Sequence, residues 1–529
     1  MFRAAMSLRA LVFVAGAAVL PFSAACGGSS ERSCEGVTTD TDQDPLNCGA
    51  CGNACAEEFK CIRGRCLAGD CVPGDVEDCY NGADGTQDIG PCVGGTRTCG
   101  ATGLWSACEG EVLPTGENGA ACRDGIDNNC NGVVDEDVDN DMDGYTTCGG
   151  DCCDSTECSK PGNVNPGAFD AAGNQFDDDC NGVVDDTILL CDQGIASNTQ
   201  NALDYARAID ICQTATMADK KWGVISGAIT LADGTGVPDV ESHAVRPKFG
   251  TGLYPQGGVN LAMISSGGAA AVGDTMPAYH QWVSYTHTGT ASSPFPADFF
   301  AANNNTLPNA PGCPDPLGSL AQDPVMLTFR IRVPTNAHSF KLSSNFYSAE
   351  FPEWTCSSYN DFFVILLDST YNGMPANPAD KNLAFYQAMG SMTKVPVGVN
   401  LGHGNTGLFT QCVNGSTGCL GDPGTISTCT SVSQLAGTGM DASDGECDAG
   451  QPLGGATGWL VTSGNVTPGE IITLRIAVWD TSDHAYDSLA VIDGFQWSVD
   501  GTNPGTVIFK EKPDLGFVPA NAEITSARL

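Results

Sequence analysis

The sequence predicts a mainly β protein, in which disulfide-rich small modules with acidic calcium-type loops precede a jelly-roll-like β-sandwich domain. Two opposite gradients along the 529 residues indicate this division. Nineteen of the 27 cysteines lie between positions 34 and 191, whereas the strand-like apolar runs, such as VMLTFRIRV, FFVILL and IITLRIAVW, lie beyond residue 320. A segment with many cysteines and few apolar residues must be held by disulfides, and one with the opposite composition can bury a hydrophobic core.

The N-terminus has the composition of an export signal. Arg3 and Arg9 form a short basic region, and the apolar run ALVFVAGAAVL is too short to span a bilayer as a stable helix. Small residues then precede Cys26. This arrangement resembles a bacterial lipoprotein signal, which implies removal of residues 1–25 and lipidation of Cys26. A lipidated Cys26 leaves 26 cysteines, an even number that suits complete pairing in an oxidising compartment.

The expected location follows from the residues after Cys26. Residue 27 is Gly rather than the Asp that retains many such lipoproteins in the inner membrane, so the resemblance implies the outer membrane or the cell surface. Residues 26–33 have the composition of a flexible tether. The net charge of −40 argues against nucleic acid and anionic membranes as partners, so the lipid is the one expected membrane contact.

Two cysteine-rich modules are expected, over residues 34–71 and 72–116. The spacing Cys48-x2-Cys51 is compatible with zinc, but disulfides are favoured in an exported chain with no histidine nearby. The segment DPLNCGACGNACAEEFKCIRGRC resembles a cysteine-rich repeat that is common in surface proteins of predatory soil bacteria.

An acidic region follows over residues 117–187. Between Cys122 and Thr187 there are 17 Asp and Glu against two basic residues, and DNNCNGVVDE at Asp127 recurs as DDDCNGVVDD at Asp177. Three segments match the first half of a calcium loop, D-x-[DN]-x-[DN]-G, in which alternate side chains converge on a hard cation and glycine permits the turn. The predicted ligands are Asp127, Asn129 and Asn131; Asp139, Asp141 and Asp143; and Asp177, Asp179 and Asn181, with Asp135 and Asp185 at position nine of the first and third loops.

The end of each loop departs from the calcium pattern. The bidentate Glu of position twelve is replaced by Val138, Gly150 and Ile188. The closing ligand is then Asp137, Asp151 or Asp186, or it comes from a neighbouring loop. The alternative is an acidic disulfide knot that binds no ion, in which close carboxylates repel one another by about 1 kcal/mol per pair even in water.

The same region resembles the MopE-type metal-binding motif. The resemblance rests on DGIDNNCNGVVDED and DGYTTCGGDC within residues 122–186, and the family is named from a copper-binding surface protein. All six histidines lie at position 243 or beyond, and hard oxygen ligands favour calcium over copper. We therefore expect calcium, with rigidity of the modules as its main role.

A helical connector over residues 188–216 is predicted from NALDYARAIDIC, braced by a disulfide between Cys191 and Cys212. The large domain then covers residues 217–510, with a tail over 511–529. In VMLTFRIRV the apolar side chains alternate with Thr and Arg, which is typical of a strand in a two-sheet sandwich.

Two segments of this domain, FKLSSNFYSAEFPEWTCSSYNDFFVILLD and AYDSLAVIDGFQWSV, resemble the choice-of-anchor L domain of bacterial surface proteins. That resemblance implies a location and a fold, but no mechanism. The last six cysteines are expected to form three staples, among them Cys412–Cys419. Polar residues inside the two segments form either an ion or saccharide site or a set of strand caps and solvated groups; they are Glu350, Glu353, Asn360, Asp361, Asp487 and Asp493.

The motifs of common enzyme classes are missing from the sequence. It contains no H-E-x-x-H, G-x-S-x-G or P-loop, and no cysteine is expected to be free as a nucleophile. We expect a calcium-stabilised surface protein that serves adhesion or envelope structure and is not an enzyme, with a glycan or a protein as its unknown ligand. The alternative is a secreted polysaccharide hydrolase that uses Glu350 and Glu353 beside Trp354.

Overall fold

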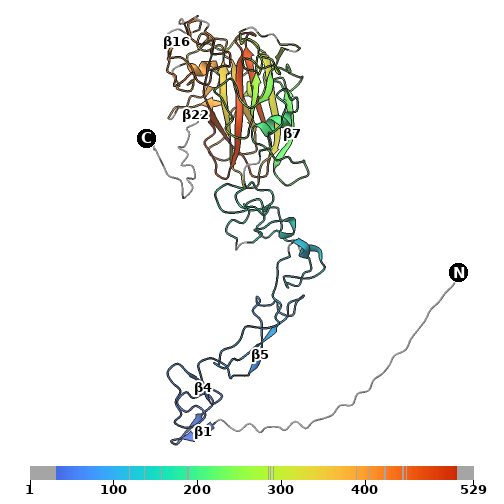
Figure 1. Ribbon diagram of the computed structural model, residues 1–529, viewed down its shortest axis with the longest axis vertical. Helices are drawn as coiled ribbons and strands as arrows, with labels where there is room; N and C mark the ends of the chain where they lie inside the picture. Colours follow the sequence, from blue (N-terminus) through green and yellow to red (C-terminus); the bar gives the residue numbers. More distant parts are fainter. Residues whose placement is uncertain are drawn as a thin grey trace, which may run out of the picture. The chain divides into compact units, whose positions relative to one another are not determined.

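The computed structural model describes residues 31–508, except 118, 136, 156–157, 187–189, 284, 286, 290, 389, 404–405, 422–424, 444–445 and 448–449. The predicted signal peptide, Cys26 and the tail therefore lie outside the described residues. The chain forms two compact units, Met1–Glu136 and Asp137–Leu529 (Figure 1). The predicted acidic region is divided between them, with the first loop in the first unit and the other two in the second.

The first unit is built from short antiparallel hairpins held by disulfides, as its composition predicts. The hairpins are β1 (Glu31–Cys34) with β2 (Val37–Asp40), β3 (Lys60–Ile62) with β4 (Arg65–Leu67), and β5 (Val76–Cys79) with β6 (Gly95–Thr98). The helical turn η1 (Gly119–Arg123) follows. The disulfides are Cys34–Cys51, Cys48–Cys61, Cys55–Cys66, Cys71–Cys99, Cys79–Cys108 and Cys92–Cys130.

The pairing refines the predicted module boundaries. Cys48 and Cys51 are both in disulfides, as favoured over zinc. Cys71 pairs with Cys99 and so belongs to the second module rather than the first. Strand β1 begins at Glu31, so the last residues of the predicted tether 26–33 are part of a hairpin.

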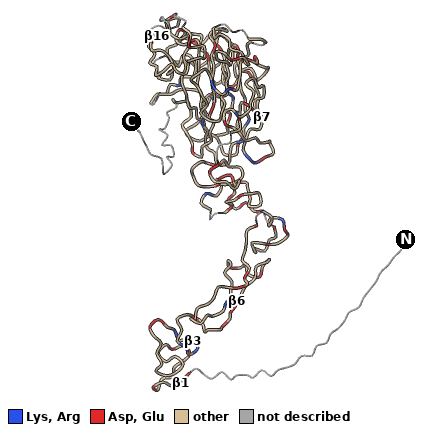
Figure 2. Tube along the Cα trace, in the orientation of Figure 1, with Lys and Arg blue, Asp and Glu red and all other residues tan. Residues whose placement is uncertain are grey.

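The second unit begins with the rest of the acidic region, where Asp and Glu gather on loops (Figure 2). In this part of the acidic region the one described helical turn is η2 (Thr147–Gly149). The disulfides Cys152–Cys180 and Cys153–Cys158 join its loops. The predicted connector helix is α1 (Ala202–Ala208), whose N-cap Asn201 accepts a hydrogen bond from the Leu203 backbone. The predicted Cys191–Cys212 disulfide is confirmed.

Two antiparallel sheets form the sandwich. One sheet has the order β10–β11–β20–β13, with β7 also paired to β11; the other has the order β22–β19–β12–β21–β9–β8, with β18 paired to β12. The first sheet consists of β7 (Gly223–Thr230), β10 (Ser292–Ser293), β11 (Ala321–Arg332), β13 (Phe362–Asp368) and β20 (Ile471–Thr481). The second consists of β8 (His243–Arg246), β9 (Leu261–Ser265), β12 (Ser339–Ser348), β18 (Gly455–Ala456), β19 (Leu460–Asn465), β21 (Ser488–Ser498) and β22 (Gly505–Ile508).

The inner faces of the two sheets share one hydrophobic core. In β11 the alternation places Leu327, Phe329 and Ile331 in this core, while Arg330 is exposed on the other face, as predicted. Phe340 and Leu342 of β12 pack into the same core from the opposite sheet. The outer faces are also covered. Phe299 of α2 (Ala297–Ala302) packs against Trp479 on one sheet, and Trp282 lies in the cluster over the other.

Three disulfides staple the loops of this domain, but one predicted pair is wrong. Cys412 pairs with Cys429 and Cys419 with Cys447, instead of Cys412 with Cys419. The reason is the hairpin of β16 (Gly415–Thr417) and β17 (Thr425–Ser427), which brings the residues flanking its two strands together across the ladder. Cys313–Cys356 is the third staple. The remaining elements are β14 (Phe385–Tyr386), β15 (Val395–Pro396) and η3 (Val399–Gly402).

Within the described part of the chain, no helix has the length and apolar character needed to cross a membrane.

Candidate metal centre

The three predicted loops have the same local geometry. In each, the carboxylate of residue one accepts hydrogen bonds from the backbone N–H groups of residues five and six, and the side-chain oxygen of residue five accepts one from residue seven. The bonds to residue six are Gly132–Asp127, Gly144–Asp139 and Gly182–Asp177, at 2.8, 2.9 and 2.8 Å. The bonds from residue seven are all 2.8 Å and come from Val133, Tyr145 and Val183.

These hydrogen bonds give the three loops the same turn. The glycine at position six has φ of 94°, 95° and 91° in the three loops, a conformation that favours glycine. The D-x-[DN]-x-[DN]-G spacing therefore gives each loop the same turn, with the glycine in the position where a calcium loop has one.

The second loop brings carboxylates from outside the loop into the same cluster. One oxygen each from Asp139, Asp141 and Asp154 lie within 4.8 Å of one another, and so do oxygens from Asp141, Asp143 and Asp151. Asp151 was one of the three predicted closing residues. Its Oδ1 accepts the Cys153 N–H at 2.8 Å, whereas its buried Oδ2 has no hydrogen-bond partner. A hard cation, which prefers oxygen ligands, could be coordinated by that oxygen.

Each loop also has a neighbouring carboxylate that the spacing did not reveal. It accepts the backbone N–H of loop residue two: Glu117 from Asn128, Asp154 from Asn140 and Asp170 from Asp178, at 2.6, 2.6 and 3.3 Å. These acids lie 10 residues before Asp127, 15 after Asp139 and 7 before Asp177. Such irregular spacing gives no motif to search for.

The other predicted residues differ in their surroundings. Asp186 Oδ2 accepts the Asn181 side-chain amide at 2.6 Å, so it lies beside the third loop, while Asp137 is exposed. Asp135 and Asp185, at position nine, accept backbone N–H groups from upstream turns, at 3.1 Å from Asp124 and 3.0 Å from Asn174. Ile188 lies outside the described residues.

Three carboxyls in or beside the second and third loops have raised pKa values, which disfavours their anionic form when no cation is present. Burial, and then the charges of Asp143 and Asp141, raise the pKa of Asp151 to about 6. Burial also raises the pKa of Asp143 and of Asp179, with neighbouring carboxylates adding to the effect. The positive charge of a bound cation would favour the ionised carboxylates and lower these pKa values.

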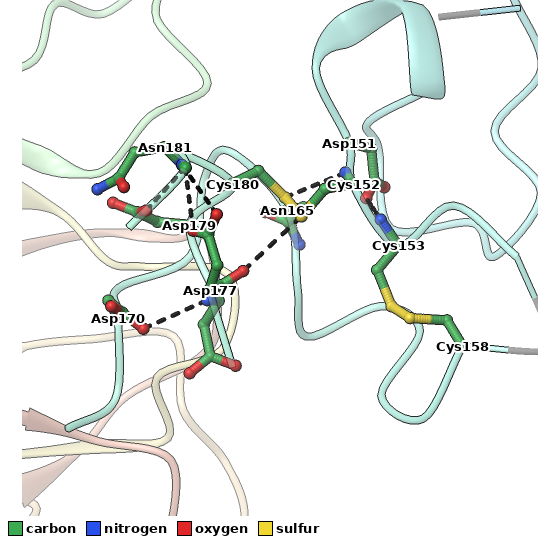
Figure 3. The surroundings of a disulfide bond; sticks show 12 residues. Asp151, Cys152, Cys153, Cys158, Asn165, Asp170, Asp177, Asp179, Cys180 and Asn181 are labelled. Atoms are coloured by element: carbon green, nitrogen blue, oxygen red, sulfur yellow. Dashed lines mark hydrogen bonds between the residues drawn. A yellow bond between two sulfur atoms is a disulfide. The ribbon is translucent and has the colours of Figure 1, made fainter. Parts of the chain in front are cut away.

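A disulfide connects the two loops of the second unit. Cys152, next to Asp151, is bonded to Cys180 of the third loop, and its backbone N–H lies 3.1 Å from the Cys180 sulfur (Figure 3). Figure 3 shows Asp170, Asp177 and Asp179 on one side of this bond and Asp151 on the other. The covalent link joins the two acidic clusters.

Residues 117–136 and 161–186 match a family of metal-binding sequences. The family is Cu-binding_MopE, described as "Putative metal-binding motif". The matched segments contain the first and third loops, while the cluster of Asp139, Asp141, Asp143 and Asp151 lies between them. No curated protein and no solved structure matches the chain.

The residues predicted to form a site in the large domain do not all lie together. Glu350, Asp361 and Asp487 are buried at one end of the sandwich, which excludes the solvated alternative for Glu350. Asn360 is used structurally, because its Oδ1 accepts the Asn400 N–H at 2.8 Å. Asp493 is buried further along β21, where the backbone N–H of Gly257 donates to it at 3.2 Å.

Proposed function

We propose that this protein is a cell-surface protein whose acidic loops bind calcium, and that the ions and disulfides together make the modules rigid. The observation that carries the proposal is the repeated geometry of the loops, together with the five carboxylates gathered at the second one. Calcium accepts six to eight oxygen ligands in flexible arrangements, so a site without the closing Glu can be completed by Asp151 or Asp154.

Calcium is favoured over copper by the donor set. The side chains that converge in the described loops offer carboxylate and amide oxygens, and the histidines of the chain all lie at position 243 or beyond. Copper in proteins prefers imidazole and sulfur ligands. The cysteines of this region are in disulfides and offer no thiolate.

The role of the protein is proposed to be adhesion or envelope structure, with lipidated Cys26 as its anchor and a choice-of-anchor L-like sandwich as its large domain. A polysaccharide hydrolase based on Glu350 and Glu353 is the weaker candidate. The two carboxylates are 2% and 0% exposed, so the segment that carries them would have to open before a polysaccharide could reach it.

Calorimetric titration of the full oxidised chain, stripped of metals by a chelator, tests the calcium proposal. We expect binding at roughly 0.1–1 mM calcium, the range typical of extracellular modules. At one hundred times the dissociation constant, the ion would stabilise the acidic region by about 2.7 kcal/mol. Replacing the first ligand of each loop (Asp127→Asn, Asp139→Asn and Asp177→Asn) should remove most of the heat and the stabilisation.

The matched control is Asp70→Asn, which removes an exposed carboxylate outside the acidic region and should leave the titration unchanged. A parallel titration with copper should give no comparable saturating signal. If the triple variant binds calcium as the parent does, the loops are not the site, and if copper displaces calcium stoichiometrically, the choice of ion is wrong.

A further inference from the structure

A second group of carboxylates lies inside the sandwich, far from the loops in sequence. Glu350 follows β12, Asp361 precedes β13, Asp480 is near the end of β20 and Asp487 precedes β21. Because β13 and β20 are antiparallel, with Phe362 opposite Trp479, the start of one lies beside the end of the other. The pairing of β12 with β21 brings their corresponding ends together in the same way.

The two sheets meet at this group. The Ser488 hydroxyl on one sheet donates to Asp361 Oδ2 beside the other at 2.6 Å, and the Thr481 N–H donates to Asp361 Oδ1 at 3.2 Å. All four carboxylates are at most 2% exposed. Asp361 is therefore satisfied by hydrogen bonds and connects the sheets.

The other three carboxylates are not satisfied in this way. Both oxygens of Asp487 and Oε2 of Glu350 are buried without a hydrogen-bond partner, whereas Asp480 lies within reach of the Ser266 hydroxyl and of Asp361. Asp487 contacts Gly267 so closely that a β-carbon there would overlap its carboxylate, which fixes the direction of the side chain. These oxygens are too far from water to be solvated.

Neighbouring carboxylates in this group also raise one another's pKa. Burial, followed by the charge of Asp480, raises the pKa of both Glu350 and Asp487 well above the ordinary value. Burial and Asp361 do the same to the pKa of Asp480, which the nearby Ser266 hydroxyl lowers only in part. Asp480 is the neighbour that connects the group.

No positive side chain compensates these charges within the described residues, where the ion pairs include none of the four. Asp323, at the same end of the sandwich, has its own partners, because His484 Nδ1 lies 2.7 Å and His287 Nδ1 3.5 Å from its oxygens. Buried carboxylates normally pair with a cation or coordinate a metal, because an unpaired buried charge costs several kcal/mol.

We propose that Asp480, Asp487 and Glu350 form a second cation site, which binds one calcium ion between the two sheets, with Asp361 as a positioning residue. Three carboxylates and a nearby hydroxyl are an oxygen-only donor set of the kind that calcium prefers. Within the described residues, the carboxylate groups whose oxygens lie within 4.8 Å of one another are in the acidic loops and not here, so binding of one ion requires these three side chains to move closer together. This site goes beyond the loops: it stabilises the sandwich itself.

Equilibrium dialysis of the full chain carrying the triple loop substitution tests this site directly. We expect one calcium ion to remain bound per chain, and we expect the sandwich to melt at a higher temperature in calcium than in chelator. Adding Asp480→Asn and Asp487→Asn should abolish both effects. Asp493→Asn is the matched control, because Asp493 is equally buried, on β21, but lies outside the group, and it should leave the calcium-dependent shift unchanged.

The opposite result has a distinct signature. If the carboxylates hold protons and no metal, the loop variant binds no calcium, and its sandwich melts at the same temperature in calcium and in chelator. The dialysis of the loop variant needs no change in the buried group, so it decides the question even if the variant with five substitutions does not fold. Failure here leaves calcium binding by the loops, measured on the parent chain, unaffected.

Discussion

The acidic loops and the interior of the sandwich both concentrate carboxylates, but they surround them differently. In the loops the carboxylates are received by backbone N–H groups on short turns that disulfides hold together. In the sandwich they lie between two sheets, beside buried aromatic residues, and several oxygens have no donor. The first arrangement needs little core, whereas the second exists only because a large core places distant strand ends side by side.

The comparison predicts that equivalent disulfides have unequal importance in the two regions. Cys152–Cys180 closes 28 residues and Cys313–Cys356 closes 43, so loop entropy gives each about 4 kcal/mol. We expect Cys152→Ser with Cys180→Ser to abolish calcium binding by the second and third loops, because few apolar contacts remain to hold them. Cys313→Ser with Cys356→Ser should lower the melting temperature of the sandwich but leave it folded. Calorimetry and calcium titration of both variants check this, and equal survival of both regions would contradict the distinction.

The same difference between local loops and distant strand ends explains which residues of each site the sequence could predict. The predicted ligands of a loop lie within six residues, so local spacing was enough to indicate that Asp127, Asp139 and Asp177 begin equivalent turns. The fold of the sandwich was also predictable, because alternation in β11 and β20 is local. Asp154 was missed because an irregular turn brings it to the loop, and Asp480 because only the pairing of β13 with β20 places it beside Asp361.

The pairing of cysteines also shows where closeness in sequence fails to predict contact. Cys412 and Cys419 are close in sequence, yet the hairpin between β16 and β17 places Cys412 beside Cys429. Sequence distance predicts contact only where the chain has no regular structure that carries neighbours apart.

The second prediction concerns acid stability, which should be limited by the sandwich rather than by the loops. His243 is buried, its Nδ1 lies 2.7 Å from the Tyr205 hydroxyl, and burial lowers its pKa to about 4, an effect that the charge of Asp239 opposes. The folded protein keeps this histidine neutral while the unfolded chain binds a proton near pH 6.5. Its contribution is therefore complete above pH 6.5 and is lost as the pH falls toward 4, by about 3 kcal/mol in all.

His243→Asn tests this contribution, because the asparagine side chain can still offer an acceptor to Tyr205 but does not titrate. The difference in unfolding free energy between parent and variant should shrink as the pH falls from 7 to 4. Buried acids with raised pKa, such as Asp493 at about 7, act in the opposite direction but equally in both proteins. A difference that does not change with pH would mean that His243 takes a proton without unfolding the domain.

The smallest expected effect concerns α1, which stands in the sequence between the two kinds of region. Asn201 caps this helix, accepting the Leu203 N–H at 3.2 Å and donating to Asp204 at 3.1 Å. Loss of such a cap costs about 1 kcal/mol. The helix contributes Tyr205 and Ala206 to the core of the sandwich, so Asn201→Ala should lower the melting temperature of that domain by a few degrees. The calcium titration of the loops should stay the same, because the hydrogen bonds to the first carboxylate of each loop come from the backbone of that loop. The variant Asn198→Ala, a few residues before the helix, serves as the control and should change neither measurement. If Asn201→Ala weakened calcium binding instead, the loops would depend on the packing of the sandwich, and the distinction between a region held by ions and disulfides and one held by a core would be wrong.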